Sequence, residues 1–336
     1  MIRFENHWCS MTDSRPWLLL RAICAWLLLG RSPAAAFADP TGIEVVKPTA
    51  YRVRIVLKIE ADKENLTRIN AKCPLPCDWR EQKVKLLSET VPPGSKSGEQ
   101  TVKGLGNLWI VSCPKLAAGR NLTFERVYEI ERFQVVSRFE SKPLTRPMRE
   151  TPEIRRALGD SPGIRLADPE LRRFAEELAK DHETPWEYAR AASDWIRNNV
   201  RYQLGDYRGA KFAFEKKLGD CEDLSALFIA LCRISEIPAR TVWVEGHAYP
   251  EFYLEDGRRG YWVPVQLFGP EEFGSIRETR PILQKGDRYR EPMTRQTVRY
   301  LPQQAIAYGG KAGLSVARTI LQPESEDSKS SDSARE

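Results

Sequence analysis

Hydrophobic and polar residues alternate along the first part of the chain. From Tyr51 to Glu60, apolar side chains occupy every second position between arginine, lysine and glutamate residues, and only Val56 departs from this period. A period of two predicts a β-strand with one buried face. Further strand candidates lie at 108–111 and 122–136, with turn signals at 92–94 and 118–119. Several short strands separated by turns predict a small antiparallel β-sandwich, which we assign to residues 39–140.

The hydrophobic period becomes that of α-helices after residue 165. Asp168 followed by Pro169 is a helix start signal, and an apolar stripe follows these two residues. Thr184 and Glu187 have the spacing of a capping box, which predicts the start of a second helix. A third helix is expected to begin near Cys221, because leucine and phenylalanine residues recur after it at helical spacing.

Three strands are predicted after the third helix, at residues 241–244, 247–254 and 261–267. The turn signal Glu255-Asp256-Gly257 separates the last two. A run of helices followed by a run of strands is typical of an α+β domain, and we assign this domain to residues 166–310.

Three segments are expected to lie outside the two domains. Residues 1–38 have a basic start at Arg15, a short apolar run and small residues at 36–38, which together predict a signal peptide cleaved before Asp39. The protein is therefore expected to be secreted or periplasmic, with no stable membrane insertion after cleavage. Repeated prolines predict a linker at 141–165, and the Ser, Asp and Glu composition of 323–336 predicts a disordered tail.

The charge of the chain argues against a nucleic-acid partner, and its composition is that of a globular protein. The chain has 336 residues, with 52 Lys and Arg against 46 Asp and Glu, so its formal net charge is +6. This excess is modest and no block of Lys or Arg occurs, so no nucleic-acid partner is expected. A hydrophobic fraction of 41% and this length suit two globular domains.

Few residues are available for histidine or cysteine chemistry. Without the predicted signal peptide the chain keeps two histidines, His182 and His247, and five cysteines. Two distant histidines give no metal-ligand spacing, so no metal ion and no cofactor are expected. One disulfide is expected in the first domain, between two of its three cysteines, and the sequence leaves the pairing open: Cys73, Cys77 and Cys113.

Cys221 has the setting of a nucleophile. A cysteine in the first turn of a helix lies at the positive end of the macrodipole, among backbone N–H groups without helical partners. This position is expected to lower the pKa of the thiol and to supply donors for an oxyanion. His247, after a glycine at the start of a predicted strand, is the candidate base. Cys232, within the helix, is expected to be a core residue.

Four stretches then resemble the transglutaminase-like superfamily. They are Gly-Asp-Cys-Glu-Asp-Leu-Ser-Ala-Leu at 219–227, Ile-Pro-Ala-Arg at 237–240, Gly-His-Ala-Tyr-Pro-Glu-Phe at 246–252 and Tyr-Trp-Val-Pro-Val-Gln at 261–266. The resemblance covers roughly residues 165–305 and is to secreted bacterial members. It implies a papain-like α+β core, with helices followed by an antiparallel sheet, and a Cys–His–Asp triad. Carried over to this chain, Cys221 is the nucleophile and His247 is the base.

The chain departs from the family pattern at the third position of the triad. Gln266 stands where the family usually has aspartate. A glutamine oxygen can accept an imidazole N–H, and we expect it to accept from Nδ1 of His247, but it supplies no negative charge. If Gln266 does not orient the histidine, Glu251 and Glu245 are the next candidates. Tyr202 is the candidate side-chain donor of the oxyanion hole, beside the backbone N–H of Cys221.

These residues predict a secreted cysteine enzyme that hydrolyses peptide or amide bonds through a thioester, with a peptide or protein as substrate. Two alternatives stay open. A cross-linking acyltransferase would use the same residues with an amine in place of water. A non-catalytic module that binds peptides or the cell envelope would have kept the fold without efficient turnover, as the neutral Gln266 suggests.

Overall fold

The computed structural model describes residues 42–139, 144–292 and 294–321. The predicted signal peptide at 1–38 and tail at 323–336 lie outside these residues. The first domain is built from strands β1 (Ile43–Ala61), β2 (Leu66–Leu75), β3 (Gln82–Thr90), β4 (Lys96–Val102), β5 (Gly106–Leu116) and β6 (Asn121–Ser137). The alternation predicted around Tyr51 is confirmed, because Val53, Ile55 and Leu57 are all buried on one face of β1.

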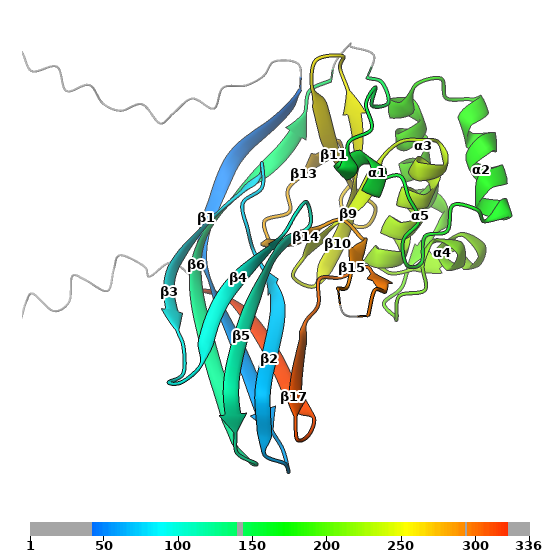
Figure 1. Cartoon of the computed structure of the whole chain (residues 1–336). Helices are drawn as coiled ribbons and strands as arrows, with labels where there is room; N and C mark the ends of the chain where they lie inside the picture. Colours follow the sequence, from blue (N-terminus) through cyan, green and yellow to red (C-terminus); the bar gives the residue numbers. More distant parts are fainter. Residues whose placement is uncertain (1–41, 140–143, 293, 322–336) are drawn as a thin grey trace, which may run out of the picture. The chain divides into compact units, whose positions relative to one another are not determined.

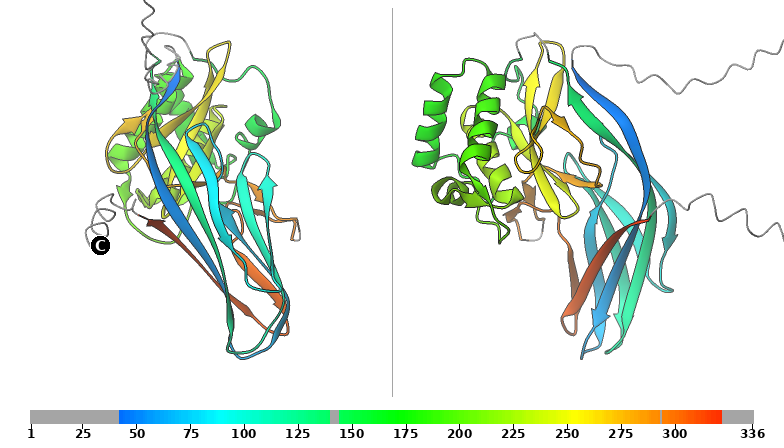
Figure 2. Two further views of the ribbon diagram at one scale, coloured as in Figure 1. Left: turned by 90° about the vertical axis from the view of Figure 1, so that its left-hand side faces the viewer. Right: turned by 180° about the vertical axis from the view of Figure 1, so that it is seen from behind.

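Two late strands complete this sandwich. β17 (Gln304–Tyr308) pairs with β2, and β18 (Ala312–Leu321) pairs with β1. The two sheets have the orders β17-β2-β5-β4 and β13-β6-β1-β18, where β13 is Ser275–Ile276, with β3 also paired to β6 (Figure 1). Figure 2 shows β18 running beside β1. β17 falls within the range expected for the second domain, but it packs Ala305 and Ala307 against the apolar cluster of the sandwich.

The predicted disulfide is wrong, because all five cysteines of the described residues are free. Cys73 lies opposite Trp109 and Cys113 lies opposite Ile69 on the paired strands β2 and β5. The two cysteines are thus separated along the ladder by four residues, or roughly 13 Å at ~3.3 Å per residue. Disulfide-linked Cα atoms lie within ~7 Å of each other, so these two thiols cannot meet without moving a strand.

The second domain begins with helices, two of which have the N-caps that the sequence predicted. The five helices in the described residues are α1 (Pro152–Arg156), α2 (Pro169–Lys180), α3 (Pro185–Asn199), α4 (Ala210–Lys216) and α5 (Cys221–Ile234). The Asp168 side chain accepts hydrogen bonds from the first turn of α2, and Thr184 forms a complete capping box with Glu187 at α3. α1 lies inside the segment predicted to be a linker, and α4 was not predicted.

An antiparallel sheet packs against α5. Its order is β12-β11-β10-β9-β14, from β9 (Ala239–Val244), β10 (His247–Glu255), β11 (Gly260–Gln266), β12 (Glu272–Phe273) and β14 (Ile282–Lys285). α5 is buried from Asp223 to Arg233 between this sheet and the other helices (Figure 1). Short strands complete the domain: β7 (Arg201–Tyr202), β8 (Leu218–Gly219), β13 (Ser275–Ile276), β15 (Tyr289–Arg290) and β16 (Thr297–Val298). The predicted α+β class, with a β-rich domain before it, is confirmed.

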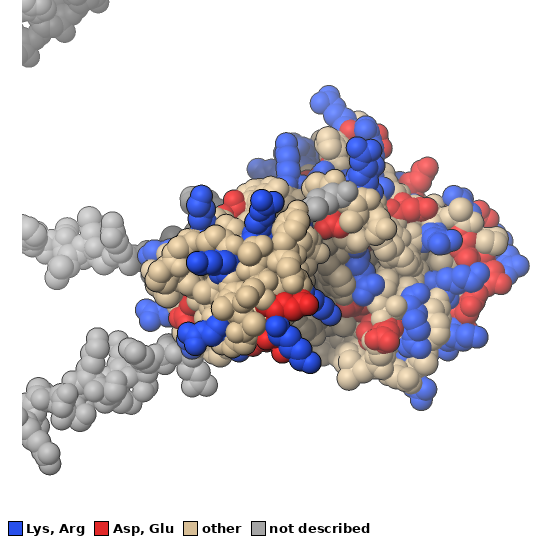
Figure 3. All heavy atoms as spheres, turned by 60° about the horizontal axis from the view of Figure 1, so that its bottom comes forward, with Lys and Arg blue, Asp and Glu red and all other residues tan. Residues whose placement is uncertain are grey.

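The two domains share backbone hydrogen bonds. β13 pairs with β6 of the sandwich, and the Gln82 side chain bonds both backbone groups of Ile282, with distances of 2.7 and 3.0 Å. No helix among the described residues has the length and apolarity needed to cross a membrane. On the face drawn in Figure 3, basic side chains are interspersed with acidic ones.

Candidate active site

Cys221 is the first residue of α5, as the sequence predicted. The Asp220 side chain caps the helix and accepts hydrogen bonds from the backbone N–H groups of Glu222 and Asp223, at 2.9 and 3.1 Å. Gly219 allows the close approach of this turn, since a Cβ there would lie 2.5 Å from Cβ of Asp223. The Cys221 side chain is half-buried at the positive end of a 14-residue helix.

His247 is brought next to Cys221 by the turn between β9 and β10. Gly246 in this turn has a φ of 68°, in the left-handed region that favours glycine. His247 is then the first residue of β10, and the backbone N–H of the following residue, Ala248, hydrogen-bonds the Cys221 thiol. The nucleophile and base proposed from the sequence therefore lie at one site, where a helix start meets a strand start.

Gln266 contacts His247, but through the other ring nitrogen than the one expected. The Gln266 Oε1 atom lies 3.2 Å from Nε2 of His247, whereas the sequence analysis named Nδ1. Nε2 is the ring nitrogen farther from the backbone, and it is the one that reaches Gln266 on the neighbouring strand β11. Because an amide oxygen only accepts, Nε2 carries the proton and Nδ1 is left unprotonated in the neutral ring.

The thiol and the imidazole are both neutral at rest. The pKa of the Cys221 thiol is raised to about 11, mainly by burial and also by the charges of Asp220 and Glu222, against the lowering effect of the Ala248 N–H. Burial also lowers the pKa of His247, and the positive charge of Arg280 adds to this effect. The lowered thiol pKa expected from the helix start is therefore wrong, because desolvation outweighs the helix terminus.

Arg197 on α3 supports the loop that carries Gln266. Its guanidinium donates to the backbone oxygens of Gln266 and Gly269, both at 3.0 Å. Within the same loop, the Phe268 ring stacks on Tyr202 with centroids 3.7 Å apart. The sequence analysis did not identify Arg197, because side-chain bonds to a distant backbone leave no periodic signal.

Strand pairing brings Tyr202 close to Cys221. It is opposite Gly219 in the parallel pair of β7 and β8, two residues before Cys221. Burial raises the pKa of the Tyr202 hydroxyl, and the charge of an ionised Cys221 raises it further. Its role in an oxyanion hole stays a prediction.

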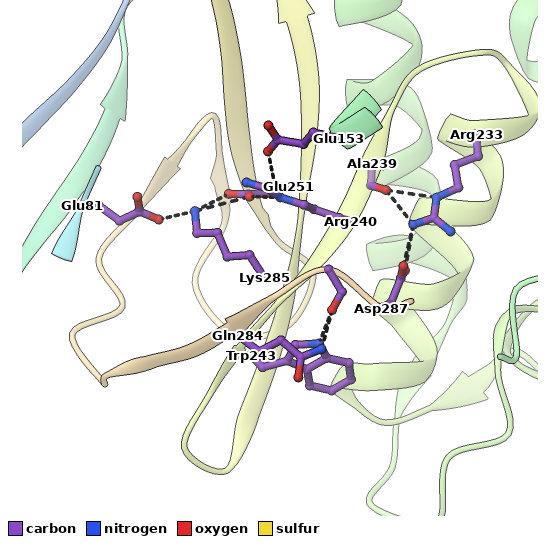
Figure 4. Close-up of polar contacts among 11 residues, drawn as sticks. Glu81, Glu153, Arg233, Ala239, Arg240, Trp243, Glu251, Gln284, Lys285 and Asp287 are labelled. Carbon is purple, nitrogen blue, oxygen red and sulfur yellow. Dashed lines mark hydrogen bonds and ion pairs between the residues drawn. The ribbon is translucent and has the colours of Figure 1, made fainter. Parts of the chain in front are cut away.

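The carboxylates named as alternative partners of His247 have partners of their own. Glu251 bonds Arg240 at 2.6 Å and Lys285 at 3.0 Å, and Glu245 pairs with Arg318 at 3.2 Å. Figure 4 shows Glu251 inside a chain of ion pairs that runs from Glu81 through Lys285, Glu251 and Arg240, all buried, to the exposed Glu153. This chain ties the sandwich residue Glu81 to the strand that begins with His247.

Glu278 and Arg280 are a pair that the sequence did not reveal, and Nη1 of Arg280 donates to the backbone oxygen of Glu245, two residues before His247, at 3.1 Å. Both residues belong to the loop between β13 and β14, where neither strand is longer than four residues. Cys232, by contrast, is fully buried in the core as expected. His182 bonds the Leu178 backbone oxygen through Nδ1 at 2.8 Å, in the turn after α2. The described residues contain no group of three or more His, Cys, Asp or Glu side chains able to hold a metal ion.

Three known proteins are similar to parts of this chain. The uncharacterized protein YebA of Bacillus subtilis strain 168 is 31% identical over 98 residues, which are 26% of this chain and 13% of YebA. A crystal structure from Cytophaga hutchinsonii, provisionally described as a cysteine protease, matches with a TM-score of 0.53 and 18% identity, over 84% of this chain and 94% of that one. The periplasmic domain of TgpA from Pseudomonas aeruginosa matches with a TM-score of 0.33 and 12% identity, over 64% and 87% of the two chains.

The family model gives the assignment its residue range. The model of the transglutaminase-like superfamily matches residues 172–267, a range that begins in α2 and contains Cys221, His247 and Gln266. Over these residues the chain matches the transglutaminase-like superfamily, the family that the sequence motifs resemble.

Proposed function

We propose that the chain is an exported cysteine hydrolase that cleaves peptide or amide bonds through a thioester on Cys221. The observation that supports this most strongly is the meeting of the α5 start and the β10 start. There the backbone N–H of Ala248, the residue after His247, donates a hydrogen bond to the Cys221 thiol. The Gln266 side chain orients the imidazole ring of His247 through Nε2. The predicted signal segment at 1–38 is the basis for export.

The proposed reaction starts from the neutral pair. Unprotonated Nδ1 of His247 takes the thiol proton as the Cys221 sulfur attacks the carbonyl carbon, which gives a tetrahedral intermediate with a negatively charged oxygen. The backbone N–H of Cys221, with Tyr202 as the candidate second donor, stabilises this oxygen. The intermediate expels the amine, which takes the proton from His247, and leaves an acyl thioester on the sulfur.

Hydrolysis of the thioester completes the cycle. His247 removes a proton from water, the hydroxide attacks the acyl carbon, and the carboxylic acid leaves as the thiol is protonated again. An amine in place of water would give a new amide, which is the acyl-transfer alternative. Gln266 is the observation that favours the second alternative, a binding module, since it cannot stabilise the imidazolium by charge.

The function is tested with the full mature chain and a library of peptides, using mass spectrometry to detect cleavage. We expect the wild type and Cys77→Ser to cleave the same peptides, and Cys221→Ala and His247→Ala to lose at least about 100-fold in rate. Cys77 is the control because it is also half-buried but lies in the sandwich domain. Hydroxylamine should divert the product to a hydroxamate if a thioester forms.

A substrate-independent readout accompanies this experiment. Iodoacetamide should modify Cys221 faster than the other thiols, and His247→Ala should remove this advantage, because the imidazole accepts the thiol proton. Cleavage that survives in Cys221→Ala would refute the mechanism. Peptide binding without any cleavage by the wild type would support the binding module instead.

A further inference from the structure

The loop at 277–281 is fixed from the sandwich side. The Tyr51 hydroxyl donates to the backbone oxygen of Thr279 at 2.5 Å, and Nε of the fully buried Arg132 donates to that of Arg280 at 3.1 Å. The Gln82 side chain holds the next residue after the loop, Ile282, by two further bonds. Hydrogen bonds from the sandwich therefore hold the backbone of this loop at residues 279, 280 and 282.

The Arg280 side chain is oriented by two partners. Its Nε and Nη2 atoms donate to the two Glu278 carboxylate oxygens at 2.9 and 2.6 Å. Its Nη1 atom donates to the backbone oxygen of Glu245, two residues before His247, at 3.1 Å. These bonds use three of the five guanidinium N–H groups, and the other two have no partner among the described residues. The side chain is 40% exposed.

Arg280 lies close enough to His247 and Cys221 to influence both side chains. The bond to the Glu245 backbone places the guanidinium beside the start of β10, and its positive charge acts on both His247 and Cys221. A cation that is oriented, partly exposed and equipped with two available N–H groups is suited to an anionic ligand.

We propose that Arg280 forms a carboxylate-binding subsite beside Cys221, which selects peptides with an acidic side chain or a free C-terminus next to the cleaved bond. The proposal rests on the proposed function and names its substrate class. A guanidinium edge binds a carboxylate by charge-assisted hydrogen bonds, which are stronger than bonds between neutral groups.

Charge balance at the site favours this class of substrate. Glu278 neutralises Arg280 at rest, so a substrate carboxylate adds one negative charge close to His247. That charge favours the imidazolium that forms during the reaction, a contribution that the neutral Gln266 does not make. The acidic groups nearest the nucleophile already have partners, since Asp220 caps α5 and Glu222 pairs with Arg299 at 3.0 Å.

The test measures binding, so that it does not depend on turnover. The full-length Cys221→Ala protein is titrated calorimetrically with peptides that differ by Glu against Gln at one position, and with the same peptides bearing a free or an amidated C-terminus. The two pairs separate an acidic side chain from a terminal carboxylate as the ligand. We expect one pair to show an affinity ratio of about 10-fold to 100-fold in favour of the carboxylate.

Variants assign the effect to this side chain. Arg280→Gln in the Cys221→Ala background should reduce the ratio to about 1. Arg277→Gln, an 80% exposed arginine of the same loop paired with Glu272, should leave the ratio unchanged. Glu278→Gln should increase the ratio, since Arg280 then lacks its resident carboxylate, and this result does not require the Arg280→Gln variant to fold.

The outcomes separate this proposal from the proposed function. A ratio near 1 for both peptide pairs, or an unchanged ratio in Arg280→Gln, overturns the subsite even if cleavage depends on Cys221. A fall of the ratio in Glu278→Gln would also overturn it. Carboxylate-dependent binding without any cleavage by the wild type would support the subsite and refute the hydrolase.

Discussion

In the proposed mechanism, Gln266 is the residue whose contribution depends most on the neutral state of Cys221 and His247. Since burial keeps the Cys221 thiol protonated and His247 unprotonated, no imidazolium exists at rest for a carboxylate to stabilise. Orientation of the ring through Nε2 is then the main task of the third residue, and an amide oxygen can perform it. Charge becomes useful only when the proton moves to His247.

Two variants of Gln266 should separate orientation from charge. Gln266→Ala should lower kcat by about 10²-fold, since the base is no longer held toward the thiol. Gln266→Asp should keep or raise kcat, and the added negative charge should raise the pKa of His247. Because the neutral imidazole is the base, the acidic limb of kcat/KM would then move to higher pH. Rates measured from pH 4 to 9 check both expectations.

Gln303→Ala, an exposed glutamine before β17, is the control for these variants. An unchanged kcat in Gln266→Ala would show that another group orients the ring. Glu251 and Glu245 are then unsuitable, since both are paired with basic side chains elsewhere.

At the residue scale, the sequence predicted which side chains meet but not their charge states. Cys221 and His247 were found because each follows a local signal, a helix start and a Gly-His strand start. The thiol pKa was predicted in the wrong direction, because burial depends on the packing of distant segments. Arg280 gave no signal, since it lies between two short strands whose residues show no period.

At the scale of elements, the connection after β11 depends on α3. Arg197 donates to two backbone oxygens of this connection, so one side chain determines where the end of β11 lies relative to His247. A loop fixed in this way keeps Gln266 in reach of the ring and keeps Phe268 stacked on Tyr202.

Arg197→Met should release this connection while leaving the helix intact. We expect kcat to fall about 10-fold with a smaller change in KM, because the ring of His247 loses its fixed partner. The free energy of unfolding should fall by about 1–2 kcal/mol from the loss of charge-assisted hydrogen bonds that are partly exposed. Arg172→Met, on the exposed face of α2, should change neither quantity. Steady-state kinetics and urea unfolding provide the measurements.

The elements with local capping signals were those that the sequence predicted. Asp168 and Thr184 each cap a helix at the predicted residue. α4 was missed because its N-cap is Gly209, which offers no side-chain bond. α1 begins after Thr151, whose hydroxyl accepts from Ile154, but its single turn lies among prolines that favoured a linker. Short helices stabilised mainly by their neighbours lack the periodicity that prediction needs.

At the scale of the whole molecule, charged groups and thiols are buried in both domains. Burial alone would raise the pKa of Glu81, but Lys285 and Arg132 lower it to about 2. Burial raises the pKa of Cys73 and Cys77 to about 11 and raises that of Cys232 as well. The folded protein thus keeps protons on thiols that the unfolded chain would lose near pH 9.

The free energy of unfolding should therefore decrease as pH rises from 9 towards 11. Over this range the unfolded state binds fewer protons than the folded state, so the slope with pH is negative, at ~1.4 kcal/mol per pH unit for each fully buried thiol. Cys232→Ala should flatten the slope by about this amount. Guanidinium unfolding at fixed ionic strength, with each variant referred to its own value at pH 7, measures the slope. An equal slope in Cys232→Ala would contradict the prediction.

The overall organisation was only partly visible in the sequence. A β-rich part followed by an α+β part was predicted from periodicity, and both are present. The return of β17 and β18 to the first part was not predicted, because strand pairing between distant segments has no local signal. The separation of Cys73 from Cys113 was not predicted for the same reason, since it is set by the register of β2 and β5.

The pairing of β1 with β18 has a consequence for the order of folding. Their ladder runs from Arg52 opposite Leu321 to Ala61 opposite Ala312, so its nearest partners are 312 − 61 = 251 residues apart. A chain that emerges N-terminus first can pair β1 with β6 early, but the other edge of β1 stays open until residues 312–321 have emerged. Closing so long a loop costs entropy before any contact repays it, and an open edge can meanwhile recruit strands from other molecules. The transglutaminase-like segment can thus be fully synthesised while the sheet beside it is still one strand short.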